Sequence, residues 1–87
     1  MEVAVWDTYV ARADGKIMHF DILVDSAMED TKKVFEFGKT YLSTKSFDTG
    51  EINSKSCSFC HIEHANPELE SAILESGFSI IEMQNCD

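Results

Sequence analysis

The sequence predicts an α+β fold in the order ββαβαβ, with a mixed four-stranded sheet and two helices packed on one face of it. Three observations support this prediction. Two alternating segments flank a short turn, two segments begin with helix-capping residues, and an apolar, strand-like run follows the second helix. The chain has 87 residues, 44 % of them hydrophobic, which suits a single domain over residues 1–87 with its own core.

Residues 3–12 and 16–24 form a predicted hairpin, because both alternate and are rich in β-branched and aromatic residues. A two-residue turn would place Asp7 on the apolar face of the second strand. A three-residue loop, with Gly15 in the left-handed conformation, instead brings the apolar side chains of both strands together. We therefore expect the three-residue loop.

The same register gives the opposite face of the hairpin four side chains that we take as a candidate polar surface: Asp7, Tyr9, His19 and Asp21. Asp7 then lies opposite Asp21, and two carboxylates about 5 Å apart repel by roughly 1 kcal/mol in water and about 3 kcal/mol at an effective dielectric of about 20. The larger value calls for a shared proton, a cation or the imidazolium of His19. His19 beside a carboxylate is also a candidate general base, although such a pair is more often a satisfied surface contact.

Ser26 and Glu29 form a capping-box pattern, which predicts a helix over residues 27–44. Its apolar residues recur at helical spacing, so one stripe is expected to pack on the sheet. Gly38 within that stripe indicates a close approach of the helix to the sheet, because glycine otherwise weakens a helix by about 1 kcal/mol. The polar residues 45–56 are expected to form a loop.

Asn66 is the predicted N-cap of a second helix, with Pro67 in its first position and Gly77 as its C-cap. Residues 78–83 follow as a strand. We expect this strand to be interior, because it is almost continuously apolar.

Residues 57–64, CSFCHIEH, allow four interpretations. Cys57, Cys60 and His61 have the spacing of a c-type haem attachment motif, but haem attachment requires export and the chain shows no export signal. A zinc site would use Cys57, Cys60, His61 and His64, with His19 as a further ligand, although only one of the two ligand pairs of a strong zinc motif is visible. A thiol–disulfide redox pair is the third interpretation, but such motifs usually open a helix.

The fourth interpretation is structural, and we favour it. Alternation along a strand places Cys57 and Cys60 on opposite faces, so their sulfurs diverge and a thiol can pack as a small buried hydrophobe. His61 and Glu63 can then join the polar surface of the hairpin. We therefore expect no cofactor, with zinc as the alternative, and we expect Cys86 to lie in a frayed end.

The net charge of −9 argues against binding to nucleic acid or anionic membranes and favours a basic partner for any protein complex. The opening MEVAVWDTYV lacks the basic start and long apolar run of a signal peptide. No segment approaches about 18 consecutive apolar residues. We therefore expect a cytoplasmic protein.

The segments VAVWDTYV, GKIMHFDILV, FEFGKTYL and CSFCHIE, with PELE followed by GFSIIEM, resemble a small bacterial family, domain-of-unknown-function family twenty-twenty-four. The resemblance covers nearly the whole chain and implies a compact α+β protein, with no activity to carry over. We expect a small, soluble, non-enzymatic binding or interaction module, with a homodimer through the mixed sheet face as one form of it. A metal-dependent or thiol-dependent protein centred on the CxxCH stretch is the alternative.

Overall fold

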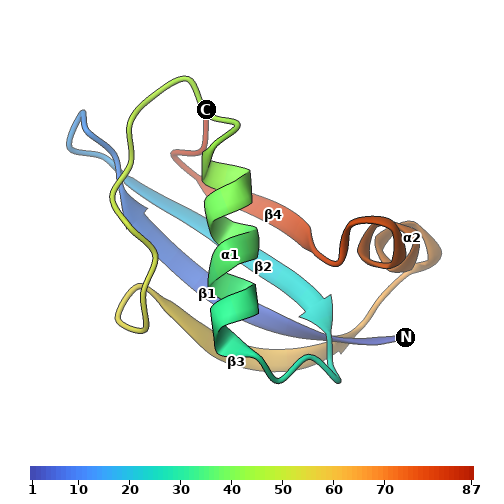
Figure 1. Cartoon of the computed structure of the whole chain (residues 1–87). Helices are drawn as coiled ribbons and strands as arrows, with labels where there is room; N and C mark the ends of the chain where they lie inside the picture. Colours follow the sequence, from blue (N-terminus) through green and yellow to red (C-terminus); the bar gives the residue numbers. More distant parts are fainter.

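A computed structural model describes all 87 residues and confirms the α+β class and the element order. The elements are β1 (Glu2–Ala11), β2 (Ile17–Asp25), α1 (Thr31–Leu42), β3 (Cys57–His64), α2 (Pro67–Ser76) and β4 (Ser79–Gln84). The four strands form one sheet in the order β3-β1-β2-β4. Figure 1 shows α1 lying across this sheet and α2 at one end of it.

All three strand pairs are antiparallel, so the prediction of a mixed sheet was wrong. The reason lies in the loop of residues 43–56. This loop runs beside the hairpin turn, where the N–H groups of Ala13 and Gly50 donate to the carbonyls of Asp48 and Ala11 at 2.9 and 2.8 Å. β3 therefore starts at the turn end of the hairpin and runs antiparallel to β1.

The hairpin register is confirmed, with Trp6 opposite Ile22. Arg12 donates its N–H to the carbonyl of Lys16 at 2.8 Å, which closes a loop of three residues. Gly15 has a φ of +90°, the left-handed conformation that this loop requires.

β4 is an edge strand and not the interior strand we expected. β1 and β2 occupy the centre of the sheet because they pair as a hairpin, which leaves only the two edges for later strands. The apolar run of β4 arises because successive side chains point to opposite faces of the sheet, and both faces of β4 carry apolar residues. Ile80 packs toward the main core, the cluster of buried side chains under α1 that includes Phe20, Ile22 and Val34, whereas Ile81 on the other face is 43 % exposed.

α1 begins later than predicted, because Asp30 and not Ser26 is its N-cap. The Asp30 carboxylate accepts the N–H of Lys32 at 3.0 Å, which satisfies an otherwise free helix donor. Before it, the carboxylate of Asp25 accepts the N–H of Ala27 at 2.9 Å and turns the chain out of β2. The intervening residues carry the chain onto the face of the sheet, so the helix starts only at Thr31.

Gly38 makes the expected close approach. A Cβ atom placed there would lie 2.3 Å from Cδ1 of Ile52 and 3.0 Å from Cδ1 of Ile22. The neighbours are therefore the long loop and β2. A larger residue would displace the loop side chain, which is packed in the main core.

The two helices pack on opposite faces of the sheet, which corrects the prediction that both cover one face. α1 covers the face of Phe20 and Ile22, where Val34 joins the main core. Ile73 of α2 packs instead in a second, smaller core on the other face: Val3, Val5, Leu23 and Ile73. α2 therefore covers only one end of the second face, and we call the remainder the open face. Neither α1 nor α2 has the length and the apolar character of a membrane-spanning helix.

The limits of α2 are as predicted. Asn66 accepts the N–H of Leu69 at 2.8 Å, and Pro67 occupies the first turn. Gly77 has a φ of +88° and ends the helix as a left-handed C-cap.

Candidate functional site

The open face carries the candidate polar surface at its centre. β1 supplies Asp7 and Tyr9, and β2 supplies His19 and Asp21, each directly opposite its predicted partner. Within this pair of strands the hydrogen-bonded pairs fall at even positions of β1, as the bond from Arg12 to Lys16 shows. Asp7 and Asp21 are thus a non-hydrogen-bonded pair, in which opposing side chains lie closest together.

Three of these side chains converge. Nε2 of His19 lies 2.5 Å from Oδ1 of Asp7. The candidate ligand atoms of Asp7, His19 and Asp21 all lie within 4.8 Å of one another. The ring of Tyr9 stacks on the imidazole with centroids 4.3 Å apart and an angle of 8°, so it fixes the plane of the imidazole. We call these three converging residues the Asp–His–Asp cluster.

The two carboxyl groups of the cluster differ in electrostatic environment. Burial raises the pKa of Asp21, and its hydrogen bond with Asp7 raises that pKa further. Burial also raises the pKa of Asp7, but hydrogen bonds with His19 and Asp21 outweigh this and leave it below its usual value. Of the two carboxyl groups, Asp21 is therefore the weaker acid and would be the first to take up a proton as the pH falls.

β3 adds a second polar pair beside the cluster. Nε2 of His61 lies 2.6 Å from Oε1 of Glu63. The pairing of β1 with β3 shifts register between Val5 and Trp6, which leaves Cys60 as an extra residue in a β-bulge. Strict alternation along residues 57–64 was therefore wrong beyond the bulge.

Because of this bulge, Cys57 and Phe59 lie on the face covered by α1, whereas His61 and Glu63 lie on the open face. His61 and Glu63 thus join the polar residues of the hairpin, a placement that the sequence allowed. A single-residue bulge leaves no clear mark in the pattern of side chains, so the alternation alone could not reveal it.

The structure does not bring together the four residues of the zinc site that we considered as the alternative. Cys57 is buried in the main core, and the hydroxyl of Thr8 lies 3.3 Å from its sulfur. Burial raises the pKa of this thiol. Cys60 is exposed, with its sulfur 3.1 Å from Nδ1 of His61, while His64 lies opposite Glu2 at the far end of β3. The two sulfurs of the motif therefore occupy separate environments, as we expected, and the geometry does not support zinc binding there.

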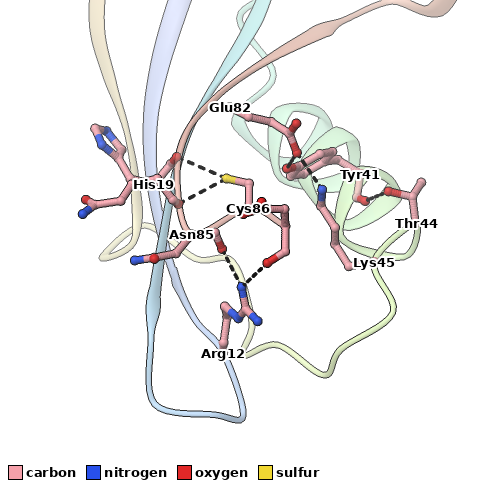
Figure 2. Close-up of polar contacts among 10 residues, drawn as sticks. Arg12, His19, Tyr41, Thr44, Lys45, Glu82, Asn85 and Cys86 are labelled. Atoms are coloured by element: carbon pink, nitrogen blue, oxygen red, sulfur yellow. Dashed lines mark hydrogen bonds and ion pairs between the residues drawn. The ribbon is translucent and has the colours of Figure 1, made fainter.

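Cys86 is not frayed but 6 % exposed, and it packs in the main core. Its thiol donates to the carbonyl of His19 at 3.4 Å, while the imidazole of that residue points the other way (Figure 2). Arg12 holds the same segment by donating to the carbonyls of Asn85 and Asp87 at 3.1 and 2.7 Å. These contacts join residues more than 60 positions apart, so no local signal predicted them.

A further polar contact missed from the sequence lies on the α1 side, where Glu82 of β4 meets the end of α1 (Figure 2). Tyr41 donates its hydroxyl to the carboxylate, and Nζ of Lys45 lies 2.6 Å from the same oxygen. Lys45 and Tyr41 lower the pKa of Glu82, in that order of importance. Burial and the carboxylate raise the pKa of Tyr41. These contacts join the edge strand β4 to the end of α1, on the face of the sheet opposite the open face.

A family model described as "Domain of unknown function (DUF2024)" matches residues 1–83. The chain belongs to this family.

Among solved structures, the DUF2024 chain is similar to the NMR structure of protein NE1680 from Nitrosomonas europaea, with 39 % sequence identity and a TM-score of 0.81. The match covers 100 % of both chains, so the fold extends over the full length of each. No curated protein matches. These comparisons establish the family and the fold, and they assign no activity.

Proposed function

We propose that this DUF2024 member is a small, non-enzymatic binding module that binds a positively charged protein segment on its open face. The observation that carries the proposal is the placement of acidic groups on this face. Asp7, Asp21 and Glu63 all lie on it, and the strand positions of the face include no lysine or arginine. Two histidines are its only basic side chains.

Side chains beside the Asp–His–Asp cluster supply apolar contact area on the open face. Tyr9 and Ile17 are each 49 % exposed, and Ile81 on β4 is 43 % exposed. Aromatic side chains are enriched in protein interfaces, so Tyr9 in particular suits a contact with a partner. The overall charge of −9 adds long-range attraction for a basic partner.

The same charge disfavours a second copy of this chain as the occupant. Two open faces in contact would oppose their carboxylates, and like charges across an interface cost several kcal/mol. A basic segment meets no such repulsion, so we favour it over the homodimer.

The test is a titration of the ¹⁵N-labelled chain with a short lysine-rich peptide, followed by NMR. The expected shifts are confined to the open-face residues of β1, β2 and β3, and they weaken as salt is added because the attraction is electrostatic. Glu63→Gln should weaken binding, whereas Glu75→Gln on α2, which removes the same charge elsewhere, should not.

Shifts centred on the loop of residues 43–56, or equal effects of the two variants, would contradict the proposal. Sedimentation of the free chain as a dimer that protects the open face would favour the homodimer instead.

A further inference from the structure

The geometry points to a binding site for one first-row divalent transition-metal ion, such as Zn²⁺, in the Asp–His–Asp cluster at the centre of the open face. Asp7, His19 and Asp21 would be its protein ligands. The inference goes beyond the proposed function, because the ion would bind the isolated chain and needs no partner protein.

The backbone already places the three ligands for a common ion. Their ligand atoms lie within 4.8 Å of one another, and tetrahedral ligands about 2.1 Å from an ion are separated by roughly 3.4 Å. To bind an ion, Nε2 of His19 and Oδ1 of Asp7, now 2.5 Å apart, would move slightly apart, and any ligand atoms farther apart than about 3.4 Å would move closer together. The ligands come from the two central, paired strands, so their Cα positions are held by the sheet and not by a loop.

Asp21 gives an independent indication that the cluster takes a ligand. The residue is 7 % exposed, and its side chain points at the other two members of the cluster. No ion pair with a lysine or arginine and no hydrogen bond from outside the cluster reaches its carboxyl group. A buried carboxylate in this situation is costly unless a cation or a hydrogen-bond donor compensates it. A divalent ion would supply the missing positive charge to both carboxylates at once.

The donor set indicates the class of ion. One imidazole nitrogen with two carboxylate oxygens suits zinc, iron or cobalt, whereas Mg²⁺ and Ca²⁺ prefer oxygen ligands alone. Tyr9 stacks on the imidazole of His19 and so holds the plane of that imidazole. Three protein ligands leave at least one coordination position open to solvent, so an exogenous group can also bind the ion.

Isothermal titration calorimetry of the full chain with Zn²⁺ tests the inference, and the visible absorption of bound Co²⁺ reports on the ligand geometry. We expect one ion per chain, no comparable binding of Mg²⁺, and affinities at least about tenfold lower in His19→Gln and Asp21→Asn. The matched controls are His64→Gln, which removes an imidazole from the other end of β3, and Cys60→Ser, which removes the exposed thiol. Both controls should bind Zn²⁺ as the unmodified chain does.

Thermal melting in the presence of a chelator shows whether each variant is folded before its affinity is interpreted. The inference is overturned if the unmodified chain shows no saturable binding, if folded His19→Gln binds as tightly as the parent, or if Cys60→Ser abolishes binding. Peptide binding with no ion binding would refute this inference alone. Ion binding with no peptide binding would refute only the proposed function.

Discussion

Replacing Asp21 by Asn is expected to stabilise the protein, because it removes one of two carboxyl groups that face each other across β1 and β2. Asp7 and Asp21 are directly opposite in a pair whose Cα atoms are about 4.5 Å apart. At a carboxylate separation of about 5 Å, the repulsion is roughly 1 kcal/mol in water and about 3 kcal/mol at an effective dielectric of about 20. Asp21 is nearly buried, which favours the larger value.

Two features reduce the gain. Burial and the hydrogen bond with Asp7 raise the pKa of Asp21, and Asp7 also has a hydrogen bond with His19. An Asn amide keeps the hydrogen bond to Asp7 without needing a shared proton. We therefore expect a net stabilisation of about 1 kcal/mol at neutral pH, which raises the melting temperature of a domain of this size by about 4–8 °C.

Calorimetric or circular-dichroism melting in excess chelator measures this change. The matched control is Glu75→Gln on the exposed surface of α2, which makes the same carboxyl-to-amide change without an opposing acid and should shift the melting temperature little. A lower melting temperature for Asp21→Asn would refute the reasoning. It would show that the Asp21 carboxyl group stabilises the fold through a contact that an amide cannot make.

The remaining predictions concern the thiols, β4 and α2. Iodoacetamide should modify the exposed Cys60 quickly and the buried Cys57 only on unfolding, as followed by peptide mass spectrometry; equal rates would mean that the main core is open at β3. Glu82→Gln should lower the melting temperature at neutral pH, and this difference should disappear in strong acid. Lys45 and Tyr41 lower the pKa of Glu82 in the folded state, so its contribution is present above its usual pKa of 4.5 and is lost as the pH falls through the folded value. A difference that persists in acid would exclude this ionic origin. Asn66→Ala should reduce the free energy of unfolding by about 1 kcal/mol, because the N–H of Leu69 loses its acceptor, and an unchanged denaturant midpoint would show that the cap is dispensable.

The sequence by itself determined the features that depend on neighbouring residues. The hairpin register follows from alternation together with Gly15, because a shift of one residue would move Asp7 into the apolar face. The limits of α2 follow from Asn66 and Gly77, which satisfy backbone groups within one turn of themselves. The composition of the polar surface was predictable for the same reason, since it needed only the register of two consecutive strands.

Only the tertiary structure decided how these units are combined. The antiparallel course of β3 and the edge position of β4 depend on the path of the loop of residues 43–56 and on which strand edges remain free. The bulge at Cys60 decides which side chains of β3 join the open face. The burial of Cys86 depends on contacts with residues far away in the chain. These features arise from pairing and packing between distant segments, whose free energy does not appear in any local pattern, and they determine which groups surround the Asp–His–Asp cluster.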